Sequence, residues 1–343
     1  MAKAATGYQA KVGAYSAGND TRQSDRQLLS LVVERGMDGA GGRCVVELGG
    51  TDFAPVEAGA PVSITLDTGQ GMLGVFTGTA YATETSAVSQ MVRASDSLAK
   101  LARVQVEGAY ADVSADFVVK DLLSKAGATA GSVASGPRLP SYVLHRNPHA
   151  LRHLENLAVL CGADLFTDGD GKVNLAVPRS GTSDHSFRFG ETVLAMELRR
   201  APAAFDGVEV WGEGAASTKG TDKAHWLSTD LSGVSGKASI DSSGAPQSSA
   251  GTRTLRVSDG AIRSGGVAQD TATAWAKALA SHWLEGSLEV FGAPEVEPGD
   301  LIEITDLPRE HGAKKLLEGH LLRVRAVRHT LDRDRGLRTR LEF

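Results

Sequence analysis

The sequence predicts an α+β, β-rich fold with two related, tube-like antiparallel β-barrel domains and an inserted α+β unit. Short runs of alternating apolar and polar residues near both ends predict the strands, because successive side chains of a strand point to opposite faces. Apolar residues at helical spacing occur between them. The 40 glycines and 5% aromatic residues are typical of many turns and short strands. A chain of 343 residues, 41% apolar, is long enough for two or three domains.

A ten-residue repeat, whose copies lie 240 positions apart, indicates a duplication. Residues 56–65 and 296–305 have the same Val, Glu, Gly, Ile and Thr at five equivalent positions. Each copy places a glycine turn before a strand whose apolar residues point to one face, Val62 and Ile64 in the first copy. The repeat therefore predicts two related β-domains, which in a symmetric oligomer would double the number of similar surfaces around the axis. Chance similarity over ten residues is the alternative.

Residues 1–90 are the first part of the first predicted β-barrel domain. Residues 28–34 are a compact apolar run, and residues 44–48 and 62–66 alternate between apolar and polar side chains. Residues 72–79 close the set. This pattern predicts a small antiparallel sheet or barrel.

Residues 91–184 are the predicted inserted α+β domain, because the apolar period changes there. Ser114 is placed to cap a helix over 115–126. Asn147, followed by a proline, is placed to cap a second, amphipathic helix that ends at Gly162. A hairpin follows this helix.

The rest of the chain divides into three predicted segments. They are 185–212, the return strands of the first β-barrel domain; 213–286, a connecting unit with a long surface loop of weak order up to residue 251 and a helix over 271–285; and 287–343, the second β-barrel domain. The last segment ends in the clearest predicted hairpin, whose strands alternate over 322–326 and 337–343 around a turn at 332–336.

Composition excludes several classes of protein. The formal net charge of −5 and the pI near 6.0 argue against a nucleic-acid-binding protein, whose basic face usually raises the whole balance. Cys44 and Cys161 form no CxxC pair, which predicts buried free thiols and synthesis in the cytoplasm. The sequence has no apolar run of membrane-spanning length and no apolar core near its N-terminus, so we expect neither membrane insertion nor export by a standard signal.

Three short motifs contain the residues of known sites without their context. Residues 69–74 match GxGxxG but lead into a strand, whereas a dinucleotide site needs a helix, so a turn is predicted. His149 and His153 have metal-ligand spacing on a helix but no third ligand, so ordinary surface histidines are predicted. Asp168 and Asp170 lack the later ligands of a calcium loop and predict a tight turn. We assign no catalytic, cofactor-binding or metal-binding residue and no cofactor.

Seven arginines lie between Arg323 and Arg340, and alternation places most of them on the non-core side of two paired strands. One interpretation is a solvated polar face. The other is a surface that meets an acidic partner or another subunit, since guanidinium groups bind carboxylates with two hydrogen bonds.

Several segments occur in an order that identifies a family. They are 56–65; 95–98 with Leu101; 114–127; 147–162 followed by 166–171; 205–210; and 296–300 with the closing strand 336–343. Together they resemble the late control gene D family, the baseplate hub proteins of contractile phage tails, which is related to the head of the VgrG/Pvc8 spike. The counterpart of the 212–251 loop cannot be aligned.

The resemblance implies a non-enzymatic structural hub. It implies a homotrimer whose two β-domains per chain form a six-fold-like ring between the tail tube and the spike, in the tail baseplate of a virion or in an injection particle assembled in the bacterial cytoplasm. Tube, spike and other baseplate or tape-measure proteins would be its partners. Because the chain stops at Phe343, without the further domains of a VgrG spike, we expect the spike to be a separate polypeptide.

Two functions of other classes remain alternatives. A tail-associated peptidoglycan hydrolase would take a carboxylate pair from residues 91–179, which a sequence alone does not exclude. A carbohydrate-binding module on a duplicated β-scaffold would bind glycans as a monomer, but the sequence contains no aromatic platform.

Overall fold

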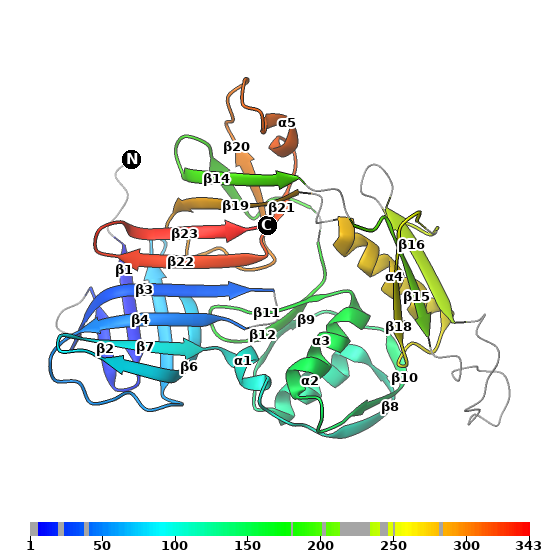
Figure 1. Cartoon of the computed structure of the whole chain (residues 1–343), viewed down its shortest axis with the longest axis horizontal. Helices are drawn as coiled ribbons and strands as arrows, with labels where there is room; N and C mark the ends of the chain where they lie inside the picture. Colours follow the sequence, from blue (N-terminus) through cyan, green and yellow to red (C-terminus); the bar gives the residue numbers. More distant parts are fainter. Residues whose placement is uncertain are drawn as a thin grey trace.

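The computed structural model describes residues 6–19, 24–37, 41–179, 181–200, 204–212, 234–240, 246–249, 251–280 and 284–343. Its largest element is an 11-stranded sheet with the order β14-β19-β23-β22-β3-β4-β7-β6-β5-β1-β2. Two β-units contribute to this sheet, and an α+β body lies beside them (Figure 1). The structure confirms the predicted β-rich α+β fold. No helix among the described residues is long and apolar enough to cross a membrane.

The N-terminal β-unit has its own apolar core. Its strands alternate between buried and less buried residues, and the buried positions, such as Val33, Val46 and Ile64, pack into one cluster. The strands are β1 (Gly7–Val12), β2 (Tyr15–Gly18), β3 (Gln27–Gly36), β4 (Arg43–Gly49), β5 (Pro61–Asp67), β6 (Leu73–Thr85) and β7 (Ser89–Ser95).

The C-terminal β-unit has a second apolar core, which includes Leu288, Ile302 and Val324. Its elements are β13 (His185–Arg188), β14 (Val193–Arg200), β19 (Leu284–Phe291), β20 (Leu301–Thr305), α5 (Lys314–Leu317), β21 (Leu322–Arg323), β22 (Ala326–Asp332) and β23 (Gly336–Glu342). The closing hairpin of β22 and β23 turns between Asp332 and Gly336, as the sequence predicts. Of the predicted strand over 322–326, only Ala326 belongs to β22, because residues 322–323 form β21 and pair with β20.

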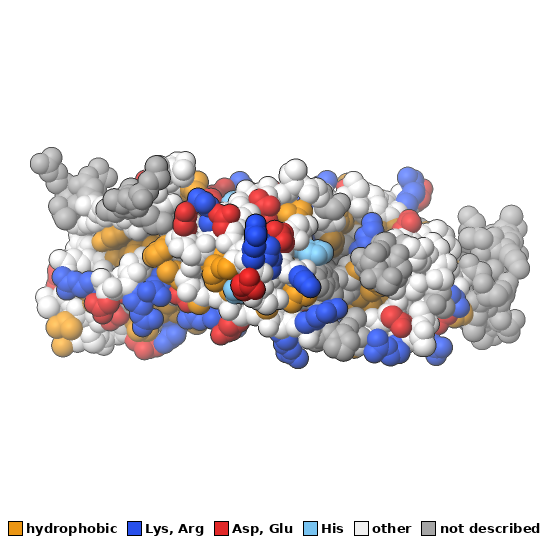
Figure 2. All heavy atoms as spheres, turned by 90° about the horizontal axis from the view of Figure 1, so that it is seen from above, with side chains coloured by type: hydrophobic (Ala, Val, Ile, Leu, Met, Phe, Trp, Pro, Cys, Tyr) orange, Lys and Arg blue, Asp and Glu red, His pale blue; other side chains and the backbone are white. Residues whose placement is uncertain are grey.

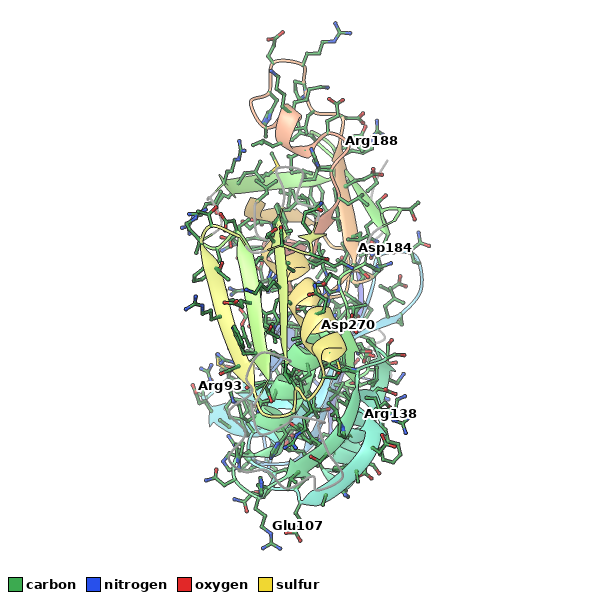
Figure 3. The ribbon with its side chains drawn as sticks, turned by 90° about the vertical axis from the view of Figure 1, so that its right-hand side faces the viewer. Arg93, Glu107, Arg138, Asp184, Arg188 and Asp270 are labelled. Carbon is green, nitrogen blue, oxygen red and sulfur yellow. The ribbon has the colours of Figure 1, made fainter. Side chains whose placement is uncertain are left out.

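The strands at 185–200 belong to this C-terminal unit and not, as the sequence analysis expected, to the first β-domain. β13 pairs in parallel with β20, and β14 pairs with β19. Asp184 and Arg188 at the two ends of β13 bind the same unit, through a hydrogen bond from the Leu301 amide and an ion pair with Asp306 (Figure 3). The local pattern identifies the strands but not their distant partners, which is why the prediction was wrong.

The α+β body contains the predicted insertion and most of the predicted connecting unit. It also contains residues 207–212, which were expected to return to the first β-domain but pair with strands at 235–240 and 254–259. The apolar residues of these segments form one cluster. The elements are α1 (Ser97–Leu101), β8 (Gly108–Ser114), α2 (Ala115–Lys125), β9 (Ala130–Val133), β10 (Arg138–Leu144), α3 (Ala150–Cys161), β11 (Asp164–Thr167), β12 (Val173–Ala176), β15 (Gly207–Gly212), β16 (Ser235–Ile240), β17 (Pro246–Gln247), β18 (Thr254–Asp259) and α4 (Gly265–Ala280).

The predicted long loop contains strand β16. Small residues hide this strand from the sequence pattern, yet they let it approach α4 closely: a Cβ added at Gly236 would lie 2.3 Å from the backbone of Ala268. Residues 213–233 lie outside the described residues. α4 begins six residues before the expected position 271. Residues 281–283 are not described, and residues 284–285, expected at the end of this helix, are instead the start of β19.

The starts of α2 and α3 are close to the predicted ones, and a further short helix, α1, precedes them. Asp96 caps α1 by accepting a hydrogen bond from the Ala99 amide at 3.2 Å, and Ser114 lies at the N-cap of α2 without a side-chain cap bond. α3 begins two residues later than expected, with His149 and not Asn147 at its N-cap. It ends at Gly162 in the left-handed conformation, as predicted.

Candidate assembly surface

The two copies of the sequence repeat form the same turn. In the first copy the Ala60 amide donates to the Glu57 carbonyl at 3.1 Å, and in the second the Asp300 amide donates to the Glu297 carbonyl at 3.2 Å. The third turn residue is glycine in both copies, with φ of 89° at position 59 and 97° at position 299. Glycine fits here because side chains disfavour positive φ.

The contacts of this turn with the next strand are also repeated. The amide of the turn glycine donates at 2.8 Å to Ala80 in the first unit and to Val324 in the second. Those two residues donate back to Ala60 and Asp300, at 2.9 and 2.8 Å. Ala80 and Val324 are therefore equivalent, and the repeat is structural as well as sequential.

The strands of the two units correspond one by one and in the same chain order. In the first half of each unit, β3 corresponds to β14, β4 to β19 and β5 to β20. In the second half, β6 corresponds to β21 and β22 together, and β7 corresponds to β23. A register shift marks the same place in both, since Leu29 of β3 and Leu194 of β14 are the extra residues opposite β4 and β19. Counting from these bulges makes Glu34 equivalent to Arg199 and Arg35 equivalent to Arg200.

The two units join inside the chain through the antiparallel pair of β22 and β3. Arg328 and Glu34 lie opposite each other and form an ion pair at 3.2 Å on one face of the sheet. On the other face, the buried Arg35 side chain forms an ion pair with Glu297 of the repeated turn. Burial raises the pKa of Glu297, and the Arg35 guanidinium opposes that shift.

A hairpin of the α+β body is wedged against this junction. The turn between β11 and β12 contacts β6, because Thr77 donates to the Gly169 carbonyl at 3.1 Å, and its Gly169 amide donates to Glu297 at 3.4 Å. Asp96 accepts hydrogen bonds from Thr167 and from the Gly42 amide. The wedge thus ties both β-units to the α+β body.

A buried histidine lies beside the junction. His329 of β22 is fully buried, and its Nδ1 shares a 3.0 Å hydrogen bond with Thr339 Oγ1, which also accepts from the Ala293 amide. Burial lowers the pKa of His329 to about 3, and the nearby Arg35 cation adds to the shift. This imidazole is therefore neutral near neutral pH.

The solvent face of the sheet is covered with charges of both signs. Ion pairs cross between neighbouring strands, including Arg338 with Glu289 at 2.9 Å and Arg93 with Glu84 at 3.1 Å. Viewed from above, acidic and basic side chains are intermixed over the C-terminal unit (Figure 2). A shallow depression of about 510 Å³ lies on this face over β3 and β22. A surface with interspersed charges of both signs can bind a partner of complementary charge.

The predicted arginine face exists only in part. Arg328, Arg338 and Arg340 are on the solvent face, as alternation predicts. Arg323 is instead largely buried and forms an ion pair with Asp164 of the α+β body. The sequence analysis singled out neither Arg35 nor His329. The partner of Arg35 is 262 positions away, and the identical Glu57 and Glu297 of the repeat were the available signal for it; His329 pairs with Thr339 within the closing hairpin.

The other sequence motifs are structural. Residues 69–72 lie in the turn between β5 and β6, and residues 73–74 begin β6, so the motif leads into a strand as predicted. Asp168 accepts the Lys172 amide within the β11–β12 turn, also as predicted. His153 is buried and bonds to the His145 carbonyl at 3.0 Å, so the expectation of a surface histidine was wrong for this residue. In the described part of the chain, no group of three or more potential ligands could hold a metal ion.

Comparisons with solved structures reveal the same fold in phage tail proteins. The tail protein of Neisseria meningitidis MC58 is 13% identical with a TM-score of 0.70, and the match covers 99% of this chain and 96% of that one. The 43 kDa tail protein of prophage MuSo2 from Shewanella oneidensis is 14% identical with a TM-score of 0.68, covering 98% of both chains. An E. coli component of the type VI secretion system is 12% identical with a TM-score of 0.56, covering 97% and 75%.

No protein-family model and no curated protein matches the sequence. The chain therefore has the fold of these tail proteins, while the late control gene D resemblance stays a proposal.

Proposed function

We propose that this chain is a structural hub of a phage tail baseplate or of a phage-derived contractile injection machine. Three copies form a ring with pseudo-six-fold symmetry that joins the tail tube to a separate spike protein. Tube, spike and other baseplate or tape-measure proteins are its partners, and its place is the tail of the assembled particle. The late control gene D family is the one to which we assign it.

One observation supports this proposal above the others. Two β-units with the same turn, the same strand order and the same bulge are joined in a continuous sheet within one chain. A trimer of such a chain presents six similar units around its axis, which suits contact between a three-fold spike and a six-fold tube. The likeness to tail proteins supports the same setting.

The molar mass of the purified chain in solution tests the proposal. Light scattering during size exclusion, repeated over a range of concentrations, should give about three times 35.8 kDa, and negative-stain images should show rings. A cell-wall turbidity assay should show no clearing. A monomer at every concentration, or clearing of cell walls, would contradict the proposal.

A further inference from the structure

The continuous sheet has two unpaired strand edges. They are equivalent to the two strands that pair with each other at the internal junction. β14 pairs only with β19 among the described strands, and residues 82–85 of β6 pair only with β7. Figure 1 places β14 and β6 at opposite ends of the eight-strand stack that includes β3 and β22. Inside the chain, the strand equivalent to β6 is β22, and it pairs with β3, the equivalent of β14.

The internal junction defines how the two edges would meet. Ala82 of β6 and Ala326 of β22 lie opposite equivalent residues, one on β7 and the other on β23. Ala82 and Ala326 are therefore equivalent. Two residues further along each strand, Glu84 is equivalent to Arg328. Arg328 lies opposite Glu34, whose equivalent is Arg199. The same register therefore places Glu84 opposite Arg199, which is the internal ion pair with its two charges exchanged.

The buried ion pair of the junction has a second, unformed equivalent. Glu297 of the repeated turn binds Arg35 of β3. Its counterpart in the repeat is Glu57, and the counterpart of Arg35 is Arg200 of β14. Both side chains are exposed, and the structure pairs neither of them with another described residue. The two charges have opposite signs, as the internal pair has.

Nothing at the β6 edge prevents such pairing among the described residues. The loop before the turn lies beside β6, with Thr83 donating to Val56 and Gln90 donating to Ala54. In the loop equivalent to it in the C-terminal unit, the Ala293 amide donates to Thr339, the counterpart of Gln90. That loop does not prevent β22 from pairing with β3. The register also brings the exposed Val88 of the β6–β7 hairpin near the exposed Leu194 of β14.

We propose that β6 of one copy pairs antiparallel with β14 of a second copy, in the register that sets Glu84 opposite Arg199 and Glu57 beside Arg200. The contact joins two different edges, so it is head-to-tail and closes a ring when the rotation allows. With eight strands per copy, three copies give a closed sheet of twenty-four strands. The number three rests on the proposed function; the edge pairing rests on the repeat.

Disulfide capture tests this register. The variant Glu84→Cys with Arg199→Cys places two thiols opposite each other, within the range that a disulfide spans. The matched control, Glu84→Cys with Ala195→Cys, uses the same face of β14 four residues away, about 13 Å out of register. The native Cys44 and Cys161 are poor competitors, because burial raises the pKa of both thiols, to about 12 for Cys161.

After mild oxidation at several protein concentrations, the in-register variant should give cross-linked dimers and trimers on non-reducing gels, at least tenfold more than the control. A chain of trimer mass without these cross-links, or with equal amounts in both variants, overturns the register while leaving the trimeric hub standing. Cross-links that extend into a ladder beyond three support the edge pairing and overturn the trimer. A monomer that cross-links in neither variant overturns the edge pairing itself.

Discussion

At the scale of single residues, one buried ion pair joins the two β-units. Arg35 and Glu297 are close in space but 262 positions apart, and 1% of the Arg35 side chain is exposed. Removing one partner of a buried pair leaves the other charge without compensation. The repeat supplies a control for this effect, because Glu57 occupies the same turn position and its side chain has no partner among the residues that the structure describes.

We expect Glu297→Gln to lower the free energy of unfolding by about 2 kcal/mol, below the ~3–5 kcal/mol of a fully buried pair because 30% of the Glu297 side chain is exposed. Glu57→Gln should change it by less than about 0.5 kcal/mol, since that side chain is exposed. Urea unfolding of dilute protein measures both. Equal losses in the two variants would contradict the role of the pair.

The buried imidazole of His329 makes stability depend on pH. Its pKa is about 3 in the folded chain and about 6.5 in an unfolded one, so below about pH 6.5 only the unfolded chain gains the proton. The free energy of unfolding therefore rises with pH between about pH 3 and pH 6.5. The contribution of His329 should be lower at pH 5 than at pH 7.5 by about 2 kcal/mol.

The variant His329→Gln lacks this titration and keeps a polar partner for Thr339. The difference in unfolding free energy between wild type and variant should therefore shrink by about 2 kcal/mol as the pH falls from 7.5 to 5. Parallel pH profiles for the two proteins would show that the imidazole does not cause the dependence.

At the scale of elements, the β11–β12 hairpin fits against β6 with no room for a side chain. A Cβ added at Gly169 would lie 1.9 Å from the Gly74 carbonyl oxygen, a backbone atom that the sheet holds in place. We expect Gly169→Ala to destabilise the protein by about 1–3 kcal/mol. Gly266→Ala is the control, because a Cβ there meets nothing within 4 Å, and the change should be neutral or slightly stabilising. Thermal unfolding measures both, and a neutral Gly169→Ala would mean that the hairpin is loosely held.

Local signals account for what the sequence predicts correctly at this scale. The turns at Gly59 and Gly299 need a residue that tolerates positive φ, and the closing hairpin has strict alternation, so both follow from neighbouring residues. The residues of β14 do not indicate its partner, because that partner, β19, follows only after the strands β15 to β18 of the α+β body. The Arg35–Glu297 ion pair could not be predicted for the same reason, since its two residues are far apart in the sequence. The duplicated Glu was visible, but only the strand order reveals which arginine each copy faces.

At the scale of the whole molecule, the repeat is incomplete within one chain. One of two equivalent junctions is made, between β22 and β3, and it carries the pairs Arg328–Glu34 and Arg35–Glu297. A chain with two units and one internal junction leaves one junction to be made with other copies. Assembly would thus reuse the contact that already joins the two halves of each copy.

The exchanged charges at the outer junction give the last prediction. Glu84→Arg alone places two cations opposite each other across the edges, and Arg199→Glu alone places two anions there. Each should weaken every interface by about 1 kcal/mol, because like charges directly opposite in a sheet destabilise it. A ring of three repeats the loss three times, so both single variants should shift the mass from trimer toward monomer at a given concentration.

The double variant, Glu84→Arg with Arg199→Glu, restores opposite charges in the same order as the internal Arg328–Glu34 pair and should recover the trimer. Light scattering over a dilution series distinguishes the four proteins. Arg93, which pairs with Glu84 within the chain at 3.1 Å, loses that partner in both Glu84→Arg variants. Recovery in the double variant is therefore attributable to contact between copies. If the double variant stayed as dissociated as Glu84→Arg alone, the two side chains would not meet across the edges.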